Sequence, residues 1–119
     1  MITRLLVLRT CAADGTSRDG FRWPLTEGAT AECPNWDADP QRDCGGGLHG
    51  LPWGYGDGGL LSWADDARWL IVEVDLAAGC VGSADKCRFR RGTVRHVGDR
   101  YTAPRVLAAE GATGPIVGH

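Results

Sequence analysis

The stretch WLIVEVDL, Trp69 to Leu76, carries the clearest structural signal in the sequence. An extended chain points successive side chains to opposite faces, so residues two apart share a face. One face here is wholly apolar, and the other mixes Ile71 with acidic residues. The apolar face comprises Leu70, Val72, Val74 and Leu76. This period of two, with several β-branched residues, predicts a β-strand.

Two segments before this strand also predict strands. ITRLLVLRT (Ile2–Thr10) is a short apolar run flanked by polar residues, as expected for a central strand buried on both faces. The turn-forming stretch DGTSRDG follows it, and FRWP (Phe21–Pro24) then alternates apolar and polar residues. These features predict an early hairpin.

Two segments after it predict further strands. In KCRFR (Lys86–Arg90), alternation places Cys87 and Phe89 inward and the three basic side chains outward. TVRHV (Thr93–Val97) is a second short strand after Gly92. The sequence therefore predicts an α+β, β-rich fold of five or six short strands.

Helical signals are few. Ser62 and Asp65 have the spacing of a capping box, which predicts one short helical turn in SWADDARW. Residues 105–110 fit either a strand or a helical turn. The segment 25–59 shows no sustained period and predicts a long irregular, glycine-rich loop. Residues 1–110 are then one globular domain, and residues 111–119 form a tail rich in glycine, alanine and threonine.

Length and composition set the class of protein. A chain of 119 residues forms one domain, and its net charge is −2. No run approaches the roughly 18 apolar residues of a membrane helix, so no membrane partner is expected. The first segment, MITRLLVLRTC, has no small-residue cleavage site, which predicts a cytoplasmic location.

The stretch CGGGLHGLPWGYGDGG (Cys44–Gly59) has eight glycines among sixteen residues, mixed with aromatic side chains. Glycine permits a positive φ and lets the backbone pass close to another surface. Trp53, Tyr55 and Trp63 could hold such a loop against the sheet. The glycines would set the path of the loop, and the aromatic residues would fix it.

The sequence has five cysteines, and an odd number leaves at least one thiol unpaired. Buried free thiols are the favoured state, ahead of a metal site and of disulfides. Cys44 and His49 could share a zinc ion, with Cys33 and Cys87 as the other ligands. Neither C-x2-C nor H-x3-H spacing is present, so structural roles are favoured and no cofactor is expected, with zinc as the alternative. Cys44 and His49 could instead be a nucleophile and its base, but no carboxylate is singled out to orient the ring.

Charge is uneven along the chain. Residues 86–105 include seven basic side chains and one acid, whereas residues 14–75 carry twelve of the fifteen carboxylates. A basic face interleaved with Phe89 and Tyr101 could bind single-stranded nucleic acid. A solvated face paired in part with the acidic loop is favoured, and nucleic acid is not an expected partner. The basic face comprises Lys86, Arg88, Arg90, Arg91 and Arg95.

Three blocks in order, CGGGLHG, WLIVEVD and DKCRF, match a C-x-x-G-[LF]-H motif, a V-E strand and an aspartate-lysine pair. The chain thereby resembles a family of small uncharacterised bacterial and phage domains. The resemblance implies a fold and a set of structural positions, without a reaction. Those positions are Cys44, Gly47, Leu48, His49, Val72, Glu73, Asp85 and Lys86, to which we add the loop aromatics Trp53 and Trp63.

Some members of that family look like N-terminal domains followed by threonine-, alanine- and glycine-rich repeats expected to form β-solenoids. EGATGPIVGH, at the end of the chain, is similar to the start of such a repeat. The resemblance implies a non-catalytic cap or attachment domain, whose partner is the repeat region of the same chain or a second copy.

A second likeness is to the ADP-ribosyltransferase fold, through GGGLHG and the later WLIVEV. It implies an NAD-binding cleft lined by Arg9, His49 and Glu73. A leucine-histidine pair replaces the usual aromatic residue, and Glu110 is the only glutamate after Glu73. The non-catalytic reading is therefore preferred to an enzyme.

Overall fold

Strand β4 (Arg68–Val74) forms where the alternation predicted a strand, and the strand predicted to be central at Ile2–Thr10 is β1 (Leu6–Cys11), which lies in the middle of the sheet. The computed structural model describes residues 4–18, 20–39, 47–83 and 86–119. Its strands pair antiparallel in the order β2-β7-β4-β1-β3-β6-β5. The other strands are β2 (Thr30–Glu32), β3 (Leu48–Pro52), β5 (Cys80–Ser83), β6 (Lys86–Phe89) and β7 (Arg91–Gly98).

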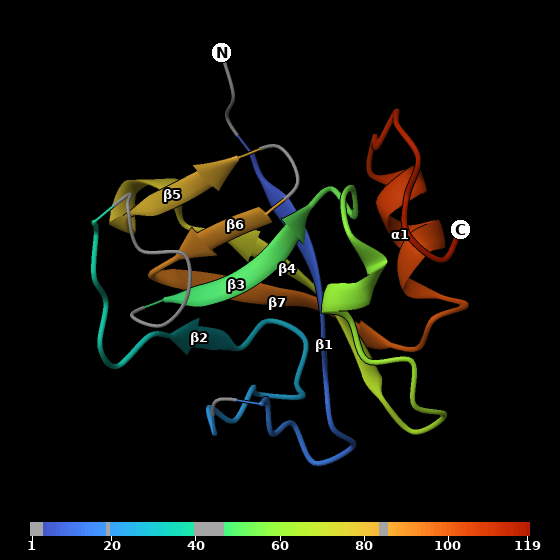
Figure 1. Cartoon of the computed structure of the whole chain (residues 1–119), viewed down its shortest axis with the longest axis horizontal. Coiled ribbons are helices and arrows are strands. Elements are labelled where there is room, and N and C mark those ends of the chain that lie inside the picture. Colours follow the sequence, from blue (N-terminus) through green and yellow to red (C-terminus); the bar gives the residue numbers. More distant parts are fainter. Residues whose placement is uncertain (1–3, 19, 40–46, 84–85) are drawn as a thin grey trace.

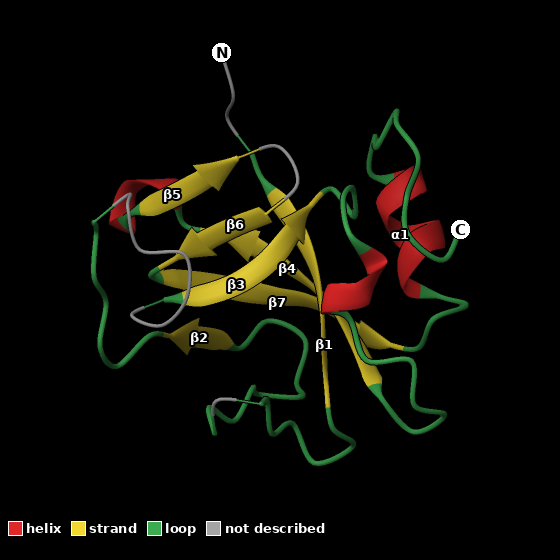
Figure 2. Ribbon diagram, viewed as in Figure 1, coloured by secondary structure: helices red, strands yellow, loops and turns green. Residues whose placement is uncertain are grey.

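Helix is scarce, so the predicted β-rich α+β fold is confirmed. The one α-helix among the described residues is α1 (Ala103–Ala109), and two single turns are 3₁₀ helices, Gly58–Leu60 and Leu76–Ala78. Figure 2 shows the helices at the margins of a body made mostly of strands.

Alternation along β1 and β4 builds two apolar clusters, one on each face of the sheet. The inner cluster includes Val7 from β1 and Leu70 and Val72 from β4. The outer cluster includes Leu8 and Ile71 from the same strands. Both strands are therefore buried on both faces, and each fully buried aliphatic side chain contributes roughly 1.5–3 kcal/mol.

The sheet curls, so that β3, β6 and β5 lie across the inner cluster from β4 and β7 (Figure 1). Leu48 on β3 and Phe89 on β6 pack into the same inner cluster as Val72 on β4. The outer face is covered by α1, which contributes Leu107, and by the C-terminal segment, which contributes Ile116.

The predicted helical turn in SWADDARW is wrong. Ser62 Oγ accepts a hydrogen bond from Ala64 N, and Ser62 N donates to Thr10 Oγ1, 2.7 Å away on β1. Such local side-chain bonds favour a turn over a helix. The helix forms instead at Ala103, where Pro104 occupies the first turn and Asp99 accepts hydrogen bonds from the backbone just before it.

Two other expectations need correction. Phe21–Pro24 is not a strand: it makes a single isolated bridge, between Thr16 and Arg22, and Trp23 packs into the inner cluster. The segment 25–59 is not wholly irregular, because it contains β2 and β3. The sequence of β3, LHGLP, does not alternate apolar and polar side chains, so no strand was predicted there. Its extended form comes from backbone pairing with β1 and β6.

Candidate functional site

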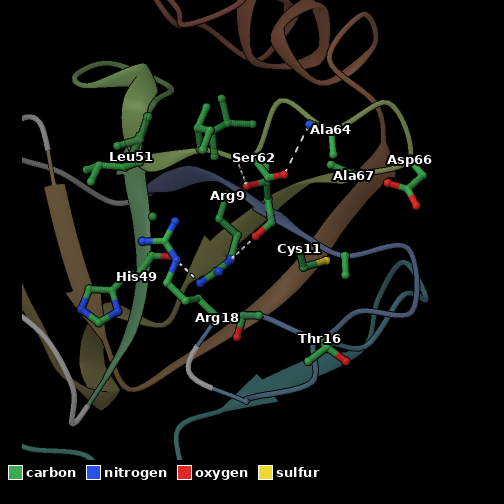
Figure 3. Close-up of a pocket in the computed structure, with 17 residues that line it drawn as sticks. Arg9, Cys11, Thr16, Arg18, His49, Leu51, Ser62, Ala64, Asp66 and Ala67 are labelled. Atoms are coloured by element: carbon green, nitrogen blue, oxygen red, sulfur yellow. Dashed lines mark hydrogen bonds between the residues drawn. The ribbon is translucent and has the colours of Figure 1, made fainter.

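A cavity of about 580 Å³ opens where β1 and β3 separate. The two strands pair at Val7–Pro52 and Leu8–Leu51, and β3 then pairs with β6 through His49 and Gly50. Figure 3 shows Arg9 in the gap with Ser62 above it, whereas the His49 ring points away from Arg9, on the far side of β3. Four leucines and three alanines line the cavity together with eight polar or charged residues, so its wall is mixed.

Three charged residues, Arg9, Arg18 and Asp66, line this cavity, and the contacts of Arg9 connect two strands. Arg9 Nη1 donates to the His49 carbonyl oxygen at 3.2 Å, and its Nε donates to the Thr10 carbonyl oxygen at 3.1 Å. Its guanidinium carbon lies 4.7 Å from the centroid of the Trp23 ring. Arg9 thus connects β1 to β3 beyond the point where their ladder ends, with a cation–π contact beneath it.

Cys11 also lines this cavity but is only 3% exposed. Burial raises the pKa of the Cys11 thiol above its ordinary value. A protonated, buried thiol is a poor nucleophile, so Cys11 is suited to packing.

Glu73 lies outside the cavity. It is on β4 opposite Leu6, and its Oε1 lies 3.2 Å from Arg4 Nε and 3.1 Å from Arg95 Nε. Arg9 contacts Trp23 in the inner cluster, whereas Glu73 shares the outer-facing alternation of Ile71. The structure therefore brings Arg9 and His49 together at one cavity but leaves Glu73 on the other face of the sheet.

The proposed zinc ligands are only partly described. Cys33 and Cys87 are both buried in the inner cluster, and Cys33 Sγ lies 3.4 Å from Asn35 Oδ1. His49 is on β3, and Cys44 lies outside the described residues. Within the described ranges no three histidine, cysteine or acidic side chains form a possible metal site. A zinc site that includes Cys44 stays a prediction.

The remaining motif residues lie around β3. Leu48 is buried, and a methyl group added at Gly47 would lie 2.2 Å from Arg88 Cγ. Trp53 packs against the outer cluster, and the Trp63 ring meets Trp69 edge-on with centroids 5.1 Å apart. Lys86 begins β6, while Cys44 and Asp85 are outside the described residues.

Arg88 differs most from its predicted environment. As predicted, Arg88 lies on the face of β6 away from Cys87 and Phe89. However, it is only 3% exposed, because residues 36–39 cover it. Its guanidinium donates to the carbonyl oxygens of Asp37 and Asp39 and lies 5.3 Å from the Trp36 ring centroid. Arg88 thus fixes a loop and is not part of a solvated basic face.

The other described members of the basic face make ion pairs. Arg91 Nη2 lies 3.0 Å from Asp75 Oδ2, and Arg95 Nε lies 3.1 Å from Glu73 Oε1. Arg90 Nε lies 4.0 Å from Glu32 Oε1. Of these acids, Glu32 lies on β2, Glu73 lies on β4 and Asp75 follows β4, so the partners lie on strands or directly after one, and not in the acidic loop that the sequence predicted. The Lys86 side chain is outside the described part of the chain.

The C-terminal segment lies against the outer face. The Tyr55 hydroxyl accepts hydrogen bonds from Thr113 N at 2.8 Å and Gly114 N at 2.9 Å, and Val117 N donates to Gly54 O at 2.9 Å. Ile116 is 8% exposed. The sequence did not indicate these contacts, because Tyr55 is nearly 60 residues away. Whether this segment begins a repeat stays a prediction.

Two apolar side chains remain uncovered near the end of this segment. Leu60 is 52% exposed and Trp63 is 44% exposed. Val117 lies against Gly58, and Gly118 lies beside the rings of Trp69 and Trp63. We call Leu60, Trp63 and Val117 the exit platform, because Leu60 and Trp63 are exposed and Val117 lies against Gly58, in the same 3₁₀ turn as Leu60.

The chain is similar to ice nucleation proteins. It is 37% identical over 113 residues to one from Pseudomonas syringae, covering 93% of this chain and 9% of that protein. It is 37% identical over 113 residues to the ice nucleation protein InaU of Pantoea ananas, covering 87% of this chain and 10% of that protein. A relative from Xanthomonas campestris pv. translucens is 34% identical over 110 residues. The chain therefore spans about a tenth of the length of the curated relatives it matches.

No family model and no solved structure matches the chain. The similarity to ice nucleation proteins contradicts the predicted cytoplasmic location, because those proteins are anchored at the outer membrane. That prediction rested on the absence of a recognisable signal in the first residues. Among the described residues, no helix has the length and apolar character needed to cross a bilayer.

Proposed function

We propose that this chain is a non-catalytic structural domain of a longer, repeat-containing ice nucleation protein, in which it precedes the repeats and supports the first of them. The proposal depends on how much of each sequence is aligned: nearly the whole of this chain aligns with about a tenth of each relative. In ice nucleation proteins an N-terminal domain precedes the repeats.

The path of the C-terminal segment supports this role. Tyr55, Gly54 and the outer cluster hold residues 112–118 against the domain, so the chain leaves from a fixed position. The exit platform lies directly beside that position. A first repeat that follows His119 would bury Leu60 and Trp63, as neighbouring units of repeat proteins bury each other's apolar faces.

The environment of Arg9 favours structure over catalysis. Two backbone carbonyls and the Trp23 ring engage its guanidinium. The glutamate required by the ADP-ribosyltransferase alternative lies on the other face of the sheet, paired with Arg4 and Arg95. The cavity therefore lacks the combination of side chains on which that alternative depends.

The test is to place this chain ahead of the repeat region of the Pseudomonas syringae relative. We expect the fusion to freeze water droplets at a higher temperature than the repeats alone, and to resist protease longer at the first repeat. The double variant Leu60→Ser/Trp63→Ser should lose this protection. Leu76→Ser, which alters an exposed leucine in a separate turn, should keep it.

Equal freezing temperatures and equal protease patterns with and without the domain would contradict the proposal. If the double variant still protects the first repeat from protease, the domain supports the repeats through some other surface, and the exit platform is not the contact.

A further inference from the structure

Cys80 and Cys87 bring two sulfur atoms together on neighbouring strands. Cys80 is on β5 and Cys87 is on β6, where Cys80 pairs with Phe89 and Gly82 pairs with Cys87. The two cysteines are thus diagonal neighbours across the ladder, and their Sγ atoms are 3.0 Å apart. A disulfide bond is about 2.05 Å long, so closure requires a movement of about 1 Å.

The two thiols differ in exposure. Cys87 is 2% exposed within the inner cluster, whereas Cys80 is partly exposed at its margin. The hydrogen bond that Cys87 donates to Cys80 lowers the pKa of the Cys80 thiol to about 7. The same hydrogen bond, together with burial, raises the pKa of the Cys87 thiol above its ordinary value. Cys80 is therefore the thiol that can both ionise near neutral pH and meet a reagent from solvent.

We propose that Cys80 and Cys87 form a disulfide bond by exchange with a small soluble disulfide. The Cys80 thiolate attacks one sulfur of that disulfide, whose S–S bond breaks and releases one thiolate. Cys87 loses its proton to solvent and attacks the Cys80 sulfur of the mixed disulfide, which releases the second thiolate. The two protein thiols are oxidised, and one small disulfide is reduced to two thiols.

The bond would join β5, an edge strand of the sheet, to β6 through side chains as well as backbone. Edge strands are held by a single ladder and open more readily than central strands. Disulfides persist at the cell surface, which is where ice nucleation proteins are anchored. The described cysteines Cys11, Cys33, Cys80 and Cys87 are free thiols in this structure, which agrees with the favoured cysteine state, and the proposal concerns an oxidised form of one pair. The C-x6-C spacing of Cys80 and Cys87 was the available signal in the sequence.

The test uses the whole purified chain, first reduced and then equilibrated with oxidised glutathione. Remaining thiols are alkylated, and the peptides are identified by mass spectrometry. We expect a crosslink between the peptides that contain Cys80 and Cys87, with the loss of two hydrogen atoms. Oxidation should also raise the melting temperature and slow hydrogen exchange in β5.

Cys80→Ser should abolish the crosslink and the rise in melting temperature. Cys33→Ser, which alters a cysteine of the inner cluster outside this hairpin, should retain both if the variant folds. Cys80→Ala, which removes the thiol without adding a hydroxyl at the margin of the inner cluster, should lose the crosslink and the rise in melting temperature as Cys80→Ser does. Complete alkylation of Cys80 and Cys87 after oxidation, or a crosslink from either to another cysteine in place of this pair, would overturn the proposal.

Discussion

The two halves of the curled sheet are stabilised differently. In the half made by β1, β4 and β7, β1 pairs with β4 continuously from Leu6–Glu73 to Cys11–Arg68, and β7 pairs along the other side of β4 with one register shift between Ile71 and Val72. In the half made by β3, β6 and β5, the strands are short, and β3 separates from β1 after two residue pairs. Both halves bury apolar side chains in the inner cluster, including Leu48 and Phe89 of the second half, but the strands of the second half also have local polar contacts that the first half lacks at its centre.

This difference is visible in what covers each half. Ile71 and Leu70 on β4 are fully buried between two apolar clusters. In the second half, the Arg88 guanidinium holds the loop over β6, and paired thiols join β5 to β6. A sheet can therefore contain a core that tolerates little loss of volume beside a region whose local contacts can be altered separately.

The largest effect is expected in the first half. Ile71→Ala should lower the free energy of unfolding by about 2–5 kcal/mol, because it removes a fully buried side chain and leaves a cavity. Chemical denaturation measures this change. Leu60→Ala, at a side chain that is 52% exposed, should change stability by less than about 0.5 kcal/mol. Equal losses for the two variants would contradict the importance of burial in β4.

A smaller and more local effect is expected at Arg88. Arg88→Met removes the donors to the Asp37 and Asp39 carbonyl oxygens and should cost about 1.5–3 kcal/mol. Hydrogen exchange should increase in residues 36–39, while β4 remains protected. Arg90→Met, at a neighbouring side chain that is 49% exposed, is the matched control and should have little effect. Loss of protection throughout β4 would show that the two halves are not separable.

Gly54 tests how the C-terminal segment is held beside β3. Its φ is +78°, and an added methyl group would lie 2.7 Å from Ile116 Cγ2 and 2.9 Å from Leu107 Cδ1. Gly54→Ala should cost about 1–3 kcal/mol and displace the segment. Gly111→Ala shares the positive φ, +117°, but meets open space, so it should cost only the backbone strain, of about 1–3 kcal/mol, and leave the C-terminal segment in place. Thermal unfolding of both variants, together with the position of the segment in each, separates steric contact from backbone strain.

The smallest effect is expected at the start of α1. Hydrogen bonds from Tyr101 N and Thr102 N hold the pKa of Asp99 below its ordinary value of 3.8. A pKa that is lower in the folded state stabilises the fold above the unfolded pKa, and this contribution is lost as pH falls through the folded pKa. Stability should therefore decline below pH 3.8, and Asp99→Asn should make that decline shallower. Asp65→Asn, in an exposed turn, is the control, and an identical pH profile for wild type and Asp99→Asn would contradict this account.

Prediction from sequence succeeded where neighbouring residues along the chain contain the information. The alternation in WLIVEV identified β4, and the alternation in KCRF correctly placed Cys87 and Phe89 inward. It failed where a distant segment decides the environment. Arg88 points away from the inner cluster as expected, yet residues 36–39 bury it, and no local pattern reports that cover.

The candidate site shows the same division. The sequence singled out Arg9 and His49, which do meet at one cavity, but joined them to Glu73, which faces the other side of the sheet. This arrangement follows from the register in which β1 pairs with β4 and from the short pairing of β1 with β3, which ends after two residue pairs. In both cases the paired segments are far apart in the chain.

The sequence by itself determined the β-rich class, the central strand and the inward side of each alternating segment, because side-chain period and apolar burial are local properties. Only the tertiary structure decided that Arg88 is buried, that the Cys80 and Cys87 sulfurs lie 3.0 Å apart, and that the C-terminal segment binds Tyr55. Each of these results depends on how the sheet curls and which strands pair, and that choice is made by the packing of the whole chain.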